Sequence, residues 1–272
     1  MTSRDDRPSL WVAFAAAAGV YGGYALLGFV PALGEVRGLL LVAAFYFLPG
    51  FLLRGDPARA RRYQVGPESP VPPWSWPAAK TALGACAICF PPFCLAFVWF
   101  YAEVCGQGRW VVEPLLALEA HLPTSGALER FLDQLCRRYV PFDGVRVILP
   151  ASFSAYGYLG AAYAAVVEVF VVALPEEVFH RGYLMSVFEE HWPPRRRLFG
   201  VPFGLAAVLA SAVFAVGHLV GMAQVGRLAT FFPGLVFAYL WKRTGSLWAG
   251  TLFHAASNLL MAVLLSSTFP GR

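Results

Sequence analysis

The chain has 272 residues, of which 58% are hydrophobic and only 14% are charged. Soluble domains carry about 25% charged residues, so the composition excludes an ordinary soluble domain. The net charge of +5 would hint at a nucleic-acid partner in a soluble protein. Here the Arg and Lys residues lie mostly in short breaks between long apolar runs, which indicates orientation in a lipid bilayer and no nucleic-acid partner.

Seven apolar runs follow one another along the chain, and all but the short sixth are near the ~20 residues that span a bilayer. They are residues 10–33, 36–53, 79–102, 148–174, 202–221, 228–241 and 246–266. The first run is too long for the core of a signal peptide, and no small-residue cleavage site follows it, so we expect it to be retained. The pattern predicts an all-α fold, a polytopic transmembrane helical bundle in an integral membrane protein.

Two polar segments separate the early runs. Residues 54–78 carry four arginines and two tryptophans, which suits a cytoplasmic loop at the membrane interface. Within residues 103–146, segment 125–139 has apolar side chains at helical spacing and predicts an amphipathic helix on the membrane or over the bundle; these side chains are Leu128, Phe131, Leu132 and Leu135. We expect residues 1–146 to form an N-terminal membrane region and residues 147–272 a second transmembrane bundle.

The cysteines form no metal-binding pattern. They are Cys86, Cys89, Cys94, Cys105 and Cys136. Cys86 and Cys89 make a C-x-x-C, but it lies within an apolar run and has no second pair. We predict that all five are small packing residues.

Pro175 leaves the number of crossings open. A proline can begin a helix, and the two glutamates that follow it suit the first turn of one. Residues 176–190 therefore form either a separate short crossing or the polar half of one broken helix with 148–174. One helix gives seven crossings in total and two helices give eight.

Three polar motifs lie in the C-terminal half of the chain, after the run 148–174 and within the runs 202–221 and 246–266. They are E-E-x-x-x-R at Glu176, Glu177 and Arg181, F-x-x-x-H at Phe214 and His218, and H-x-x-x-N at His254 and Asn258. Titratable side chains inside a bilayer are costly, so they are candidates for function. Each motif alone has a plainer explanation: solvated charges at an interface, a packing histidine, or polar contacts between helices.

Helix geometry separates the two glutamates. Glu177 and Arg181 are four residues apart and share a face, so they can pair. Glu176 points about 100° away from Glu177, because an α-helix has 3.6 residues per turn. Arginine therefore neutralises Glu177, and Glu176 is left for another task.

The chemistry that these groups suit is the activation of water. A carboxylate in a low-dielectric site accepts a proton readily and is a competent general base. Histidine and asparagine can donate hydrogen bonds to a developing oxyanion. The sequence has no G-x-S-x-G, no P-loop and no H-E-x-x-H pattern, and it offers no serine or cysteine nucleophile with a base at a known spacing.

The ordered motifs, with the local sequence LPEEVFHRGYL, resemble the CPBP family over residues 150–266. This family, also called Abi, includes CAAX prenyl endopeptidases and bacteriocin-processing proteins. The resemblance implies peptide-bond hydrolysis within the membrane. Glu176 would be the general base, His218 would position the water with it, and His254 with Asn258 would form the oxyanion site. Glu177 and Arg181 match the supporting positions, and His180 stands where many members have phenylalanine.

The composition, rich in Ala, Arg and Gly, is typical of a GC-rich bacterium, where farnesylated CAAX proteins are not expected. We therefore expect the bacterial inner membrane and a membrane-anchored protein substrate, which would be cut near its C-terminal anchor for sorting, as in the myxosortase-type branch of the family.

Two alternatives stay open. A zinc protease would use Glu176, His218 and His254 as ligands, because two histidines, a carboxylate and a water make a catalytic zinc site. We expect no metal or other cofactor, since Asn258 is a poor zinc ligand. In a different class, the chain would be a non-catalytic membrane protein, such as an immunity or transport scaffold.

Overall fold

The computed structural model of the chain describes residues 7–34, 36–66, 72–106, 110–121, 126–137, 145–154 and 158–269. Its elements are almost all helical. In chain order they are α1 (Leu10–Leu27), η2 (Pro31–Leu33), α2 (Arg37–Leu52), α3 (Pro57–Tyr63), α4 (Trp76–Cys105), α5 (Val112–Glu119), α6 (Ala127–Arg137), α7 (Ala151–Ser154), α8 (Tyr158–Val167), η3 (Glu168–Ala173), α9 (Leu174–Glu177), η4 (Val178–Met185), α10 (Ser186–His191), β1 (Arg196–Leu198), β2 (Val201–Phe203), α11 (Leu205–Met222), η5 (Val225–Thr230), α12 (Phe231–Thr244) and α13 (Leu247–Thr268). Elements η2 and η5 are 3₁₀-helices, whereas η3 and η4 are π-helices.

Five helices in the described part of the chain are long and apolar enough to cross a membrane. They are Leu10–Leu27, Trp76–Cys105, Leu159–His191, Leu205–Met222 and Leu247–Thr268. α2 is apolar but has only 16 residues, and α12 has 14. The chain is thus an integral membrane protein, but the predicted count of seven or eight crossings is not confirmed.

Pro175 does not begin a separate helix, which was one of the two alternatives that the sequence left open. It lies inside one continuous helix, Leu159–His191, so residues 148–174 and 176–190 do not form two separate helical crossings. The π-helix η3 directly before it explains this, because the N–H of Leu174 bonds to the carbonyl of Val169, five residues back. Where backbone bonds span five residues, the chain can accommodate a proline that lacks an N–H.

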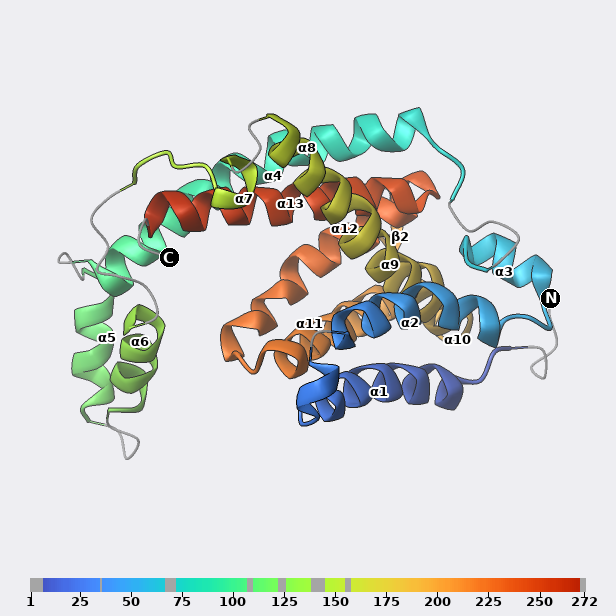
Figure 1. Ribbon diagram of the computed structural model, residues 1–272, viewed down its shortest axis with the longest axis horizontal. Coiled ribbons are helices and arrows are strands. Elements are labelled where there is room, and N and C mark those ends of the chain that lie inside the picture. The colour runs from blue at the N-terminus through green and yellow to red at the C-terminus, as the bar shows by residue number, and fades with distance from the viewer. Residues whose placement is uncertain are drawn as a thin grey trace. The chain divides into compact units, whose positions relative to one another are not determined.

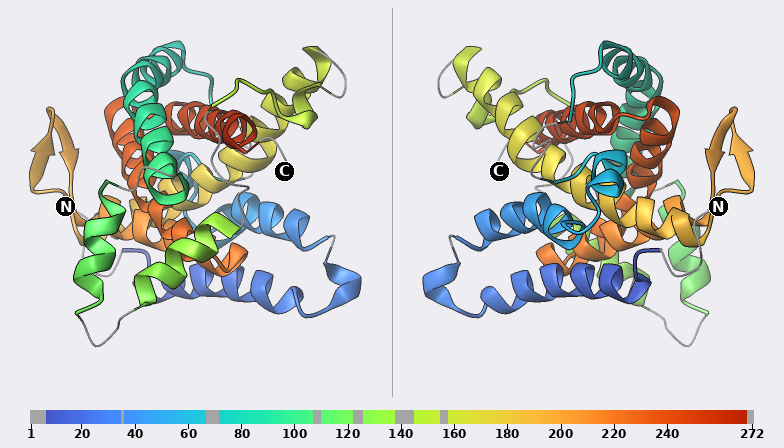
Figure 2. Two further views of the ribbon diagram at one scale, coloured as in Figure 1. Left: turned by 90° about the vertical axis from the view of Figure 1, so that its left-hand side faces the viewer. Right: turned by 90° about the vertical axis from the view of Figure 1, so that its right-hand side faces the viewer.

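The predicted helical fold also contains a short β-hairpin. β1 pairs with β2 antiparallel, with Leu198 opposite Val201, and Figure 2 shows the hairpin projecting from the helices of its unit. The two residues of the turn, Phe199 and Gly200, both have positive φ angles, as the tight type I′ turn requires. The apolar run 202–221, which was predicted to form a transmembrane helix, therefore begins within the short strand β2.

Contacts divide the chain into two compact units, and the three polar motifs fall mainly in the first. This unit comprises residues 1–84 and 166–255. Within it α1 packs against α2 and α11, and α2 and α11 both pack against η4 (Figure 1). The interior contains large apolar side chains, namely Phe179, Tyr183, Leu184, Phe188, Phe214 and Phe237, but also buried polar ones, namely Glu177, His180, Arg181, Ser211, Thr251 and His254.

Glu190 anchors α3 to the end of α10 in the same unit. Its carboxylate accepts hydrogen bonds from Arg59 Nε at 3.2 Å, from Tyr63 Oη at 2.7 Å and from Arg62 Nη2. Burial and the hydrogen bond to Glu190 raise the pKa of Tyr63 well above its ordinary value. The basic segment predicted as a loop at 54–78 therefore contains a helix with a defined attachment.

The second unit comprises residues 85–165 and 256–272 and is held together mainly by apolar contacts. One cluster consists of Phe97, Tyr101, Leu264 and Phe269, and another of Val104, Val112 and Leu132. The predicted amphipathic segment forms the helix α6; residues 125, 138 and 139 lie outside the described residues. The predicted boundary between 146 and 147 differs from this division into units and stays a prediction.

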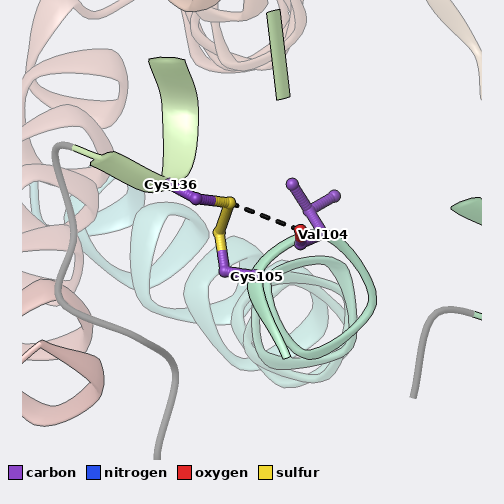
Figure 3. Close-up of a disulfide and its surroundings, with 3 residues drawn as sticks. All are labelled: Val104, Cys105 and Cys136. Carbon is purple, nitrogen blue, oxygen red and sulfur yellow. Dashed lines mark hydrogen bonds between the residues drawn. A yellow bond between two sulfur atoms is a disulfide. The ribbon is translucent and has the colours of Figure 1, made fainter. Parts of the chain in front are cut away.

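A disulfide joins Cys105, at the end of α4, to Cys136 in α6 (Figure 3). The prediction that all five cysteines are packing residues is wrong for this pair, whereas Cys86, Cys89 and Cys94 are free. Cys136 follows Leu132 by four residues and therefore shares its face of α6. That face packs on the end of α4, and Cys136 Sγ lies 3.3 Å from the carbonyl oxygen of Val104.

Candidate active site

The two glutamates of the first motif lie in a helix segment that departs from α geometry on both sides. Glu176 and Glu177 end the short α9, with π-helix η3 before it and π-helix η4 after it. π-helical turns inside longer helices occur frequently at functional sites. Gly182 allows the backbone at Tyr63 to approach this helix closely, since a Cβ at Gly182 would stand 2.9 Å from the carbonyl oxygen of Tyr63.

The predicted pairing of Glu177 with Arg181 is present and fully buried. Arg181 Nη1 lies 3.1 Å from Glu177 Oε1, and neither side chain is exposed. This contact is an ion pair without hydrogen-bond alignment, because Nη1 has no hydrogen-bond partner among the described residues. Arg181 Nη2 donates to the carbonyl of Gly234 at 2.9 Å, and its guanidinium lies over the rings of Phe214 and Phe237, 4.6 and 4.9 Å from their centroids.

Two glycines make room for this ion pair. A Cβ at Gly250 in α13 would stand 2.7 Å from Glu177 Oε2, and a Cβ at Gly234 in α12 would stand 3.3 Å from Arg181 Nη2. Neither glycine was predicted from the sequence to belong to the site. In the sequence, Gly250 is marked only by its place one helical turn before His254. The position of Gly234 opposite Arg181 is known only from the fold.

His254 contacts both glutamates. Its Nδ1 hydrogen-bonds Glu177 Oε1 at 3.2 Å, and its Nε2 lies 3.7 Å from Glu176 Oε2. The ring stacks on Phe237, with centroids 4.5 Å apart and an interplanar angle of 16°. Because a carboxylate only accepts hydrogen bonds, Nδ1 carries a proton and Glu177 fixes the orientation of the ring. The sequence predicted only that Glu177 pairs with Arg181. In the structure, Glu177 also orients His254.

Glu176 is the more accessible of the two carboxylates. Its side chain is 16% exposed, whereas that of Glu177 is 0% exposed. Its Oε2 atom is buried and has no hydrogen-bond partner among the residues that the structure describes. A buried carboxylate oxygen without a donor is costly, which favours a donor supplied by water or by a ligand.

Phe214 stands between three histidines. Its ring centroid lies 4.4 Å from that of His218, 5.0 Å from that of His180 and 5.7 Å from that of His254. His218 Nδ1 donates to the carbonyl of Phe214 at 3.0 Å, which fixes the ring in its own helix and leaves Nε2 as an acceptor. No hydrogen bond within the described ranges joins His218 to Glu176, so their cooperation stays a prediction.

Asn258 follows His254 by one turn of α13, as the motif requires, but it belongs to the second unit. Its role beside His254 therefore stays a prediction.

The proposed zinc ligands do not form a metal site in this arrangement. Glu176 approaches His254, but no group of three His, Cys, Asp or Glu side chains in the described residues is arranged to hold a metal ion. His218 uses its Nδ1 on its own helix. We derive no step through zinc.

A comparison with protein families finds a match for part of the chain. Residues 158–260 match the model described as Rce1-like, type II CAAX prenyl endopeptidase Rce1-like. These residues form an Rce1-like domain. The matched range contains every predicted site residue from Glu176 to Asn258, and it lies within the predicted resemblance over 150–266.

The Rce1-like domain implies a membrane protease of the CAAX endopeptidase type. No curated protein and no solved structure matches the chain. The assignment to a particular branch of the family stays a prediction.

Proposed function

We propose that the protein is an intramembrane endopeptidase, in which Glu176 activates water to hydrolyse a peptide bond of a membrane-anchored protein. The observation that carries this proposal is the buried Glu176 Oε2, which lies 3.7 Å from His254 Nε2 and has no hydrogen-bond donor among the described residues. A carboxylate held beside an imidazole in a water-poor site is suited to general-base catalysis.

In the reaction, the Glu176 carboxylate takes a proton from water while the water oxygen bonds to the scissile carbonyl carbon. The resulting oxyanion needs hydrogen-bond donors, and His254 and Asn258 are the candidates. The C–N bond then breaks, and Glu176 returns its proton to the leaving amine. One water is consumed, and one carboxylic acid and one amine are formed.

The charges around His254 bear on its part in this reaction. Its Nδ1 proton is directed at Glu177, so it can donate to an oxyanion through Nε2 only as the imidazolium. The two carboxylates and Arg181 together leave one negative charge beside His254. Glu177 and Arg181 act as structural partners in this scheme.

The substrate class follows from the position of the site. Glu176 and His254 lie on helices that are long and apolar enough to cross a membrane. A soluble substrate would reach a site on such helices poorly. We infer that the enzyme sorts exported proteins in the bacterial inner membrane, cutting near a C-terminal anchoring helix, as predicted for the myxosortase-type branch.

Mapping of protein C-termini tests this function. Membrane and secreted fractions are compared between cells with the protein, cells lacking it, and deleted cells that express it again. We expect at least one anchored protein to lose its C-terminal helix only where the protease is present. Unchanged C-termini and unchanged release in all three strains would contradict the sorting role.

A further inference from the structure

His180 is fully buried in η4, and both of its ring nitrogens are engaged. Nδ1 lies 2.8 Å from the backbone carbonyl oxygen of Glu176, and Nε2 lies 2.7 Å from the hydroxyl oxygen of Tyr21 in α1. The imidazole thus joins the candidate general base to a helix that starts 166 residues before it in the chain and lies outside the Rce1-like domain.

The partners fix the direction of both hydrogen bonds. A carbonyl oxygen only accepts, so Nδ1 of His180 carries a proton and donates to Glu176. In a neutral imidazole Nε2 is then an acceptor, and the Tyr21 hydroxyl donates to it. The result is a chain of donors that runs from Tyr21 through His180 to the backbone of Glu176.

Gly217 gives Tyr21 its place. A Cβ at Gly217 would stand 1.9 Å from Tyr21 Cζ and 2.3 Å from its hydroxyl oxygen, so any side chain there would displace the tyrosine. Gly217 directly precedes His218 in α11. Tyr21 therefore touches the helix of the second motif while it bonds to the helix of the first.

The ring of His180 is also held from the sides. Its centroid lies 5.4 Å from that of Phe45 in α2 and 5.0 Å from that of Phe214 in α11, both edge to face. Aromatic contacts at such distances stabilise a defined ring orientation. With both nitrogens bonded and both sides packed, the imidazole can hold the Glu176 backbone in one position.

We propose that Tyr21 and His180 are positioning residues for Glu176, and that α1 is thereby part of the catalytic apparatus. The proposal rests on the proposed role of Glu176. Neither residue touches the reacting atoms in this scheme. They keep the general base at the distance from water that proton transfer requires, and a displacement of about 1 Å can lower a rate about 100-fold.

The test measures cleavage by purified full-length protein in proteoliposomes. The probe is a peptide that spans a C-terminal cleavage site identified by the mapping above. Tyr21→Phe removes only the hydroxyl group. His180→Asn keeps a donor near the Nδ1 position but cannot reach Tyr21. We expect each variant to lower kcat about 10-fold with little change in KM, and the double variant to be no worse than either single one.

A matched pair of glycine substitutions in α11 tests the placement of Tyr21. Gly217→Ala should displace Tyr21 and lower kcat at least as much as Tyr21→Phe does. Gly221→Ala, one turn later, should leave kcat unchanged, because its Cβ would meet Tyr24 at an ordinary 3.6 Å.

A spectroscopic readout separates this proposal from the proposed function. In protein with ¹⁵N-labelled histidine, the resonances lost in His180→Asn should report a protonated Nδ1 and an unprotonated Nε2. The opposite tautomer, or wild-type kcat in Tyr21→Phe, would overturn the positioning role while Glu176→Gln is still inactive. Cleavage that survives Glu176→Gln would instead overturn the proposed function, and the positioning role with it.

Discussion

Both units of the protein bury glutamates, but in different chemical settings. In the second unit, Glu103 accepts a hydrogen bond from the backbone N–H of Val111 at 3.0 Å, and Glu119 accepts one from that of Leu128 at 2.6 Å. In the first unit, Glu176 and Glu177 each have a buried oxygen without a hydrogen-bond donor among the described residues.

The contrast shows that burial of a carboxylate does not by itself mark an active site. The glutamates of the second unit complete the hydrogen bonding of neighbouring backbone, which is a structural task. Those of the first unit are matched with an arginine and a histidine and are left incompletely bonded. Buried polar groups that are left without a hydrogen-bond partner call for an explanation, and a catalytic role is one. Changes at Glu176 should therefore affect cleavage, whereas changes at Glu103 or Glu119 should affect stability alone.

The largest effect is expected at the buried ion pair. Arg181→Met removes the positive charge and leaves Glu177 buried without it, which costs about 3–5 kcal/mol of stability. Arg130→Met is a matched control in α6, where the arginine is exposed, and should change stability by less than about 0.5 kcal/mol. Thermal unfolding in detergent measures both. Equal melting temperatures for the two variants would contradict the role given to Arg181.

The disulfide should have the next largest effect, and on the second unit only. Its loss in Cys105→Ser should destabilise that unit by roughly 2–4 kcal/mol and leave cleavage unchanged. Disulfides persist in oxidising compartments, so the Cys105 end of α4 should lie on the extracytoplasmic side, opposite the basic residues 54–80. Maleimide labelling of Cys105 and Cys136 in intact cells, with Cys86, Cys89 and Cys94 replaced by serine, checks this. Labelling without prior reduction would contradict it.

A smaller effect is expected where α13 passes Glu177. Gly250→Ala places a Cβ 2.7 Å from Glu177 Oε2, and such overpacking costs about 1–3 kcal/mol. Because the displaced carboxylate also orients His254, cleavage should fall with stability. Gly84→Ala in α4, where a Cβ would meet nothing within 4 Å, should change neither. A fully active Gly250→Ala would show that Glu177 does not hold His254 for the reaction.

Local rules predicted much of the site. The spacing of three and four residues placed Glu177 beside Arg181 and gave α6 its apolar face, because these features depend only on the α-helical period. The ordered motifs identified the class of domain that the family comparison then matched over residues 158–260.

What the sequence could not supply depends on partners far along the chain or on departures from α geometry. The π-helices around α9 make Pro175 compatible with a continuous helix, and no pattern in the sequence predicted these π-helices. The contact of Tyr21 with His180 joins residues 159 positions apart. Gly217 and Gly250 matter only because of what approaches them. Nor could the pairing of Cys105 with Cys136 be deduced from spacing alone.

The most direct test compares two adjacent residues of identical chemistry. Glu176→Gln and Glu177→Gln are each measured for thermal stability in detergent and for cleavage of the mapped peptide. Glu176→Gln should be as stable as the parent and cleave roughly 10²–10⁴-fold more slowly, because it removes the base but no ion pair. Glu177→Gln should lose about 3–5 kcal/mol of stability, because Arg181 is left buried without its partner. A Glu176→Gln protein that cleaves at the parent rate, or a Glu177→Gln protein that is fully stable but inactive, would contradict the assignment of the two glutamates.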